Sequence, residues 1–234
     1  MGEVLKIEHL SKSYEDIKVL DDISISVKAG EVLVIVGPSG CGKSTLLRCI
    51  NGLEDIQDGK VSIEGRTGMV FQSYDLFPHM SVLQNLMLAP LKVQKRRKDE
   101  VKKEAEAMLE RVGLSSKKNN YPRQLSGGQK QRVAIVRALI MHPEVLLFDE
   151  VTAALDPEMV REVLDVILDL AKQNKTMLIV THEMAFARAI ADRVIFLEGG
   201  KIIEDTSPAQ FFDDPRTERA KKFLSTFEYE KVHE

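Results

Sequence analysis

The sequence predicts an α/β fold in which a mostly parallel sheet is joined to an N-terminal antiparallel β-layer and carries an inserted helical segment. A continuous apolar run at residues 31–36 is typical of a strand that is covered on both faces. Similar runs recur at 145–149, 177–181 and 193–197, with a helical stretch at 157–173 between the first two. Residues 75–142 show helical periodicity instead, which predicts a helical subdomain inserted into the sheet.

The N-terminal residues predict the antiparallel layer. Residues 4–9 alternate between apolar and polar side chains, and Ile23, Ile25 and Val27 line one face of a second strand. Ala29 and Gly30 then turn the chain into the apolar run at 31–36. We therefore expect an antiparallel layer beside the parallel core.

A glycine-rich sequence of the form G-x-x-x-x-G-K-[ST] follows the apolar run and opens a predicted helix at residues 43–51. Its residues are Gly37, Pro38, Ser39, Gly40, Cys41, Gly42, Lys43, Ser44 and Thr45. The glycines let several backbone N–H groups surround one anion at a helix N-terminus, where the helix dipole favours negative charge. Lys43 is then expected to reach the β- and γ-phosphates of a nucleotide, and the Ser44 hydroxyl to bind Mg²⁺.

The helical segment contains a second glycine-rich sequence. Val101, Ala105, Met108 and Val112 recur at helical spacing, and Gly113 ends that helix. A further helix is predicted at 130–141, with Ser126 as its N-cap. Ser126, Gly127, Gly128 and Gln129 thus form another helix end suited to an anion. Since the first loop already supplies a complete phosphate cradle, a second copy of the chain could present this end to the γ-phosphate.

Two acidic residues end the apolar run at 145–149. Asp149 is expected to face the Mg²⁺ ion, because it lies at the carboxyl end of a predicted parallel strand. Glu150 could polarise an attacking water molecule as a general base. An acidic pair at a strand end is by itself a common surface feature, but together with the phosphate loop it indicates nucleotide hydrolysis.

The C-terminal residues predict packing rather than a partner site. Gly199 and Gly200 form a hairpin turn into a strand at 201–204, and Ser207 and Pro208 are typical of an N-cap and a first helical residue. An apolar face follows, on helices interrupted near Pro215, and consists of Phe211, Phe212, Phe223, Leu224 and Phe227.

Composition excludes several classes of protein. The 234 residues are 44% hydrophobic, which suffices for a sizeable core in one domain, yet no apolar run reaches the length of a membrane span. The first residues lack the apolar stretch of a signal peptide, so a cytosolic location is expected. A net charge of −3 argues against a nucleic-acid surface, and the basic residues at 92–103 are interpreted as a solvated loop leading into a helix.

The two cysteines are expected to be reduced thiols. Cys41 and Cys49 lie about 12 Å apart along the predicted helix, too far for a disulfide. Cys41 lies within the phosphate loop, so its alkylation is expected to block nucleotide binding.

With these motifs, the chain resembles the ATP-binding subunit of ABC transporters over nearly all its length. The resemblance implies a single ABC ATPase domain at 1–234 with a P-loop NTPase core and a helical subdomain at 75–142. It also implies that Tyr14 stacks on adenine, that Gln72 contacts Mg²⁺ and the attacking water, and that His182 contacts the γ-phosphate. Asp156 corresponds to the family's D-loop residue at the dimer interface.

The mechanism implied by the resemblance is a head-to-tail homodimer closed by two ATP molecules. Ser126, Gly127, Gly128 and Gln129 of one copy complete the site of the other, and Glu150, His182 and Gln72 serve hydrolysis. The resemblance further implies two membrane-spanning permease subunits, a separate substrate-binding protein and a peripheral place at the cytoplasmic face of the membrane.

The finer resemblance is to the polar amino acid uptake branch, on the sequences at 85–90, 181–187 and 211–215. The alternatives are an ATPase for export, lipoprotein release or cell division, and an ATP-dependent switch with little turnover. Neighbouring genes or a co-purified membrane subunit would identify an ATPase for export, lipoprotein release or cell division. Measured ATP turnover would identify a switch.

Three features depart from the family pattern. Val151 stands where proline is usual after the catalytic glutamate, and Ala153 where serine is usual in the D-loop. The interval from Gly59 to Gln72 is short, and Gly65 and Gly68 are expected to permit a tight connection in a trimmed β-subdomain with an intact Q-loop.

Overall fold

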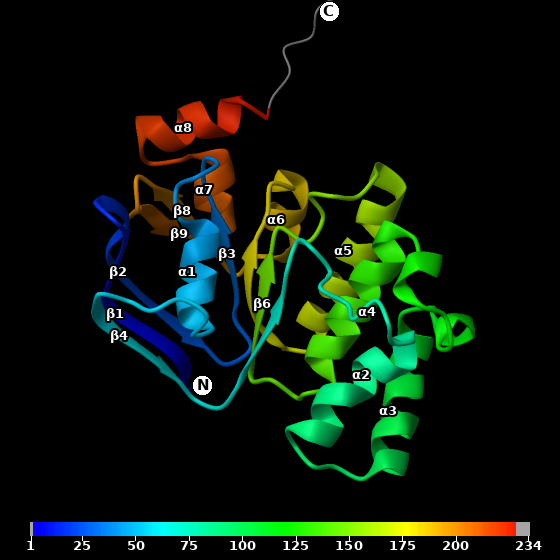
Figure 1. The fold of residues 1–234 in the computed structure, drawn as a ribbon. Helices are drawn as coiled ribbons and strands as arrows, with labels where there is room; N and C mark the ends of the chain where they lie inside the picture. Colours follow the sequence, from blue (N-terminus) through cyan, green and yellow to red (C-terminus); the bar gives the residue numbers. More distant parts are fainter. Residues whose placement is uncertain (1, 228–234) are drawn as a thin grey trace, which may run out of the picture.

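The computed structural model describes residues 2–227, and Figure 1 shows its ribbon. The strands are β1 (Glu3–Tyr14), β2 (Ile17–Lys28), β3 (Val32–Val36), β4 (Asp58–Ile63), β5 (Thr67–Val70), β6 (Val145–Asp149), β7 (Thr176–Val180), β8 (Arg193–Glu198) and β9 (Lys201–Thr206). The α-helices are α1 (Lys43–Ile50), α2 (Val82–Lys92), α3 (Lys98–Arg111), α4 (Gly127–Leu139), α5 (Pro157–Lys172), α6 (Met184–Ile190), α7 (Pro208–Asp213) and α8 (Glu218–Ser225). Two short 3₁₀ helices, η1 (Ser115–Lys117) and η2 (Pro122–Gln124), precede α4.

The strands form two sheets. A six-stranded sheet has the order β5-β6-β7-β3-β8-β9, and every neighbouring pair in it is parallel except β8 and β9. A three-stranded antiparallel sheet has the order β2-β1-β4 and lies beside α1 (Figure 1). Because β5, β6, β7 and β3 run in parallel, their carboxyl ends meet at one edge of the large sheet, where ligands bind in such folds.

Strand β3 separates two hydrophobic cores because its side chains alternate between the two faces of the sheet. Leu33 and Ile35 pack with α1 and the antiparallel sheet, whereas Val32, Val34 and Val36 pack with residues of α4 to α8. All five side chains are buried, as the uninterrupted apolar run predicted. A third core lies among α2, α3 and α4.

Side-chain caps fix where several helices begin. Ser81 and Ser126 each accept a hydrogen bond from the backbone three residues on, within complete capping boxes at α2 and α4. Ser207 caps α7 ahead of Pro208, as predicted, and Asp156 caps α5 ahead of Pro157 in the same way. Helix α4 therefore starts at Gly127, three residues before the predicted start.

The C-terminal aromatic residues pack on the large sheet. Phe211 is fully buried, and the Phe196 ring of β8 lies 6.0 Å from the Phe211 ring and 5.1 Å from the Phe223 ring. Phe227, by contrast, is exposed at the end of the described chain. The interpretation of this segment as packing agrees with these contacts.

Two details differ from the prediction. Gly68 lies inside β5 rather than in the turn, and a Cβ at this position would come within 2.9 Å of the Pro143 ring, so the residue serves close packing. The turn itself falls at residues 64–66, where Gly65 has φ of +92°. In α3, Leu109 rather than Met108 continues the buried row after Val101 and Ala105.

None of the helices among residues 2–227 combines the length and apolar character needed to cross a membrane.

Candidate functional site

The phosphate loop connects β3 to α1, as predicted. Gly42 is the N-cap of α1 with φ of +104°, and a Cβ there would lie 2.8 Å from the Val19 carbonyl oxygen. At Gly37 the corresponding distance to the Leu197 carbonyl oxygen would be 2.0 Å. Neither position has room for a side chain, so the loop can lie close to β2 and β8 only because glycine stands at both.

The Lys43 ammonium group lies at the centre of this loop. Its Nζ atom donates hydrogen bonds of 2.9 Å to the carbonyl oxygens of Gly37 and Pro38, and lies 3.9 Å from Glu150 Oε1. The side chain is almost fully buried. A buried cation in the loop is suited to a charge-assisted hydrogen bond with a phosphate oxygen.

Ser44 and Asp149 meet across the carboxyl edge of the sheet. Ser44 Oγ donates a 2.6 Å hydrogen bond to Asp149 Oδ1 at the end of β6. Burial raises the pKa of the Asp149 carboxyl, and the Ser44 hydrogen bond partly offsets this rise. The pair presents oxygen atoms of the kind that Mg²⁺ prefers, next to the phosphate loop.

Glu150 and His182 lie next to this pair. His182 Nε2 and Glu150 Oε1 are 2.9 Å apart, on segments that follow the neighbouring strands β6 and β7. Glu150 adopts a left-handed backbone conformation, with φ of +46°. The carboxylate therefore contacts both His182 and Lys43, while Asp149, one residue earlier, contacts Ser44.

Gln72 and Tyr14, two further predicted site residues, lie near the ends of β5 and β1. Gln72 is exposed and follows β5 by two residues, and β5 pairs with β6 up to Val70 and Phe148. It is therefore placed at the same sheet edge as Asp149. Tyr14 is 39% exposed at the end of β1, with the Lys12 ammonium 4.8 Å from its ring centroid, so one ring face is taken by a cation.

The signature segment, residues 125–129, lies away from the phosphate loop. Figure 1 shows α4, which this segment opens, well separated from α1. Ser126 Oγ accepts from the Gln129 backbone N–H at 3.3 Å, and Gln129 Oε1 accepts from the Ser126 N–H at 3.2 Å. A Cβ on Gly127 or Gly128 would come within 3 Å of Leu155 or Met159 respectively, so these glycines let α4 pack against the start of α5. One chain thus holds two separate helix starts with glycines, at α1 and at α4.

Asp156 has a structural role that the sequence analysis missed. Its Oδ1 atom accepts a 3.1 Å hydrogen bond from the Met159 N–H and caps α5. The signal was available, since an Asp followed by Pro before an apolar periodic stretch is typical of a helix start.

Gln131 is another buried polar residue that the sequence analysis did not single out. It is fully buried on α4, and its Nε2 donates to the Phe71 carbonyl oxygen at 3.2 Å. Gln131 lies on the same face of α4 as the buried residues Gly128 and Ile135, at spacings of three and four residues. This spacing is the sequence pattern that indicates its burial.

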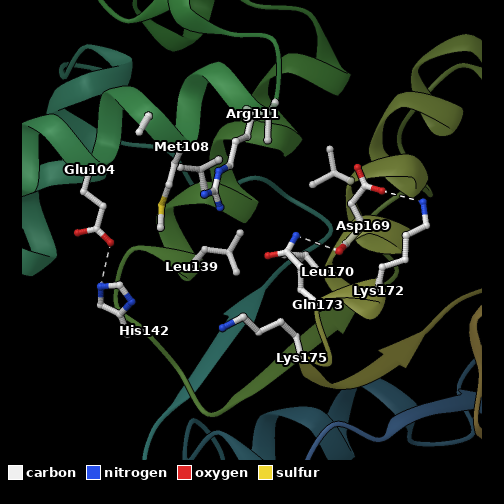
Figure 2. A pocket seen from close by; sticks show the side chains of 14 residues that line it. Glu104, Met108, Arg111, Leu139, His142, Asp169, Leu170, Lys172, Gln173 and Lys175 are labelled. Atoms are coloured by element: carbon white, nitrogen blue, oxygen red, sulfur yellow. Dashed lines mark hydrogen bonds and ion pairs between the residues drawn. The ribbon is translucent and has the colours of Figure 1, made fainter.

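A cavity of about 820 Å³ lies elsewhere, between α3, α4 and α5 (Figure 2). Met108, Leu139 and Leu170 supply apolar lining, and none of the predicted site residues takes part. Its acidic groups are paired within the cavity wall, Glu104 with His142 and Asp169 with Lys172, each at 2.9 Å. His142 precedes β6, so this cavity lies at the opposite end of that strand from Asp149.

Both cysteines are free, as predicted, and both are also buried. Burial also raises the pKa of each thiol.

Comparison with known proteins agrees with this geometry. Residues 20–153 match the family described as ABC transporter. The chain is 52% identical over 237 residues to the glutamate/aspartate import ATP-binding protein GltL of Escherichia coli (strain K12), covering 95% of this chain and 98% of the relative. It is 51% identical over 237 residues to the glutamine transport ATP-binding protein GlnQ of Bacillus subtilis (strain 168), with the same coverage.

Solved structures give the same result. An ATP-binding cassette in a dimeric post-hydrolysis state with ADP and Pi is 33% identical, with a TM-score of 0.78 over 87% of this chain and 98% of the other. The cbiO1 protein of Clostridium perfringens, part of the ABC transporter complex cbiONQ, is 30% identical, with a TM-score of 0.81 over 97% and 96%. The fold class expected from the sequence is confirmed. The chain therefore belongs to the ABC transporter family, as an ATP-binding subunit most similar to those of the polar amino acid uptake branch.

Proposed function

We propose that this chain hydrolyses ATP to ADP and phosphate and thereby energises the import of a polar amino acid. The observation that carries the proposal is the group of five side chains at one sheet edge, formed by Lys43, Ser44, Asp149, Glu150 and His182. Relatives at about half sequence identity are named for the import or transport of glutamate, aspartate and glutamine, which supports the substrate class.

The phosphate loop and Lys43 bind the phosphates of ATP in this proposal. Mg²⁺ fits beside them, because Ser44 Oγ and Asp149 Oδ1 are already within 2.6 Å of each other and Mg²⁺ is usually held by one or two carboxylates plus phosphate oxygens. Gln72 supplies a further oxygen from the neighbouring segment. When bound, the ion neutralises negative charge on the phosphate oxygens.

Glu150 acts as the general base in the hydrolytic step. A water molecule attacks the γ-phosphorus, the bond to the oxygen bridging the β- and γ-phosphates breaks, and Glu150 accepts a proton from the water. In this proposal His182 holds the Glu150 carboxylate through the 2.9 Å contact between Nε2 and Oε1 and also contacts the γ-phosphate of ATP. Tyr14 stacks on the adenine ring.

The second anion-binding helix end serves the partner copy. Ser126, Gly127, Gly128 and Gln129 of one chain complete the ATP site of the other, and Asp156 lies at the interface. Separation of α4 from α1 within one chain supports this arrangement, because the signature segment is not placed on its own phosphate loop. Two membrane-spanning permease subunits bind the dimer at the cytoplasmic face of the membrane, and a separate substrate-binding protein delivers the amino acid.

The first test compares the wild type with Glu150→Gln, using ATPase assays and light scattering with and without Mg-ATP. Glu150→Gln is expected to bind ATP, form a stable dimer and lose turnover by at least about a hundredfold, as for removal of a general base. Glu218→Gln on the exposed face of α8 is the matched control and is expected to behave as the wild type. A wild type without turnover, or a monomer throughout, would refute the proposal.

The second test addresses the substrate. The chain is reconstituted in liposomes with its membrane-spanning permease subunits and supplied with binding protein and labelled glutamate, aspartate, glutamine or arginine. ATP-dependent uptake of at least one is expected. Efflux, or ATP turnover without uptake of any amino acid, would favour the export, lipoprotein-release or cell-division classes.

A further inference from the structure

The segment of residues 71–75, which carries Gln72, lies along α4. Gln131 Nε2 donates to the Phe71 carbonyl oxygen at 3.2 Å. Further along the helix, Arg137 Nη2 donates to the Tyr74 carbonyl oxygen at 3.1 Å, and Arg137 Nη1 donates to the Asp75 carbonyl oxygen. Three hydrogen bonds from α4 therefore hold the backbone on both sides of Gln72.

The side chain of Tyr74 adds two contacts near the start of the helix. The Lys130 ammonium lies 5.8 Å from the Tyr74 ring centroid. A Cβ on Gly127 would lie 3.0 Å from Tyr74 Oη, so a side chain at that position would displace the tyrosine. The signature segment thus lies against Tyr74, while Gln131 and Arg137, further along α4, are hydrogen-bonded to segment 71–75.

Gln131 is a polar residue in the packed interior of the protein. It is fully buried, and its Oε1 atom has no hydrogen-bond partner among residues 2–227. Exchanging the two amide atoms would place Oε1 against the Phe71 carbonyl, which is also an acceptor, so the orientation with Nε2 as donor is the one that makes a bond. A buried amide with an unused acceptor is unfavourable relative to leucine, which would fill similar volume. The bond to Phe71 is therefore what the glutamine contributes at this position.

We propose that Gln131 and Arg137 are positioning residues that fix segment 71–75 to α4, so that Gln72 moves with the signature segment as one rigid unit. Neither residue touches the phosphate loop; each acts only through the backbone beside Gln72. The consequence for turnover rests on the proposed function, because it requires Gln72 to act at the ATP site of its own chain. In the proposed dimer, α4 would then couple the ATP bound by the partner copy to the ATP bound by its own chain.

The test measures backbone hydrogen exchange of peptides covering residues 71–75, together with kcat and KM for ATP, in the full chain. Gln131→Leu removes the bond to Phe71, and Arg137→Lys keeps the charge but removes the two-pronged contact with Tyr74 and Asp75. Exchange in this segment is expected to rise about fivefold for each bond of ordinary strength that is lost. The kcat is expected to fall by a similar factor while KM changes little, since Gln72 serves the reacting water.

Arg132→Lys is the matched control. Arg132 also lies on α4 and donates to a backbone carbonyl, but that carbonyl belongs to Val112 at the end of α3. This variant is expected to leave both exchange at 71–75 and kcat unchanged. Unchanged exchange in the Gln131→Leu/Arg137→Lys double variant would overturn the inference, as would faster exchange with unaltered kcat. A wild type that lacks ATPase activity would refute the proposed function, whereas the exchange measurement would still decide whether α4 fixes the segment.

Discussion

Two roles of Asp156 can be tested separately: capping of α5, and the proposed contact with the partner copy at the dimer interface. Its carboxylate accepts the Met159 N–H at 3.1 Å on an exposed helix end. Loss of such a cap costs about 1 kcal/mol, and loss of the negative charge near the helix N-terminus costs about 0.5 kcal/mol more. Asp156→Ala is therefore expected to lower the free energy of unfolding by about 1.5 kcal/mol, whereas Asp156→Asn keeps the cap and loses only about 0.5 kcal/mol.

The measurement is urea unfolding of the isolated chain. In thermal scans the alanine variant should melt about 3–6 °C below the wild type, given a shift of about 2–4 °C per kcal/mol for a chain of this size. An alanine variant as stable as the wild type would refute the reasoning, since the capping bond would then contribute nothing.

The interface role is tested in the Glu150→Gln background by ATP-dependent dimer formation. If Asp156 contacts the partner copy, both substitutions weaken the dimer, including the asparagine variant that keeps most of the stability. If the alanine variant loses most of the dimer and the asparagine variant loses little, dimer formation tracks the free energy of unfolding. That result would show that Asp156 acts as a helix cap alone.

Three further predictions concern buried groups. Ser44→Ala removes the hydrogen-bond donor to Asp149 and should lower the free energy of unfolding at neutral pH by about 2 kcal/mol. Burial holds the pKa of Asp149 above its usual value. Urea titrations should therefore show part of this loss regained as the pH falls and the carboxyl is protonated. Alkylation of Cys41 should be slow at pH 7 and accelerate beyond pH 9, since burial raises the pKa of its thiol. The modified protein should no longer retain labelled ATP in a filter-binding assay. Rapid labelling at pH 7 would contradict the expected effect of burial on the thiol. Phe211→Ala should cost about 3–5 kcal/mol in calorimetry because the ring is fully buried against Phe196, and a loss below about 1 kcal/mol would mean that the site collapses without a cavity.

The proximity of Lys43, Ser44, Asp149, Glu150 and His182 could be expected from the sequence, because each motif is local and lies at a strand end. Ser44 and Asp149 are 105 residues apart, yet their contact follows from the rule that parallel strands end at a common edge. The pairing of Glu150 with His182 follows from the same rule, applied to β6 and β7.

What the sequence analysis missed depends on contacts between distant elements. Gly68 was interpreted as a turn residue because the proximity of Pro143 is visible only in the folded chain. Gln131 was overlooked because a glutamine in a helix beginning with Gly127 and Gly128 is typical of a solvent-exposed position, and burial was decided by its packing against Phe71. The cap at Asp156, in contrast, follows from local sequence, since Asp before Pro157 is typical of a helix start.

The left-handed backbone of Glu150 has a consequence for protein engineering. A non-glycine residue in this conformation costs about 1–2 kcal/mol relative to glycine, and asparagine tolerates it better than glutamate. Libraries of this chain that are selected only for heat resistance should therefore accumulate glycine or asparagine at position 150. Such selections would enrich well-folded subunits without the proposed general base, so any stability screen needs a parallel assay of ATP turnover.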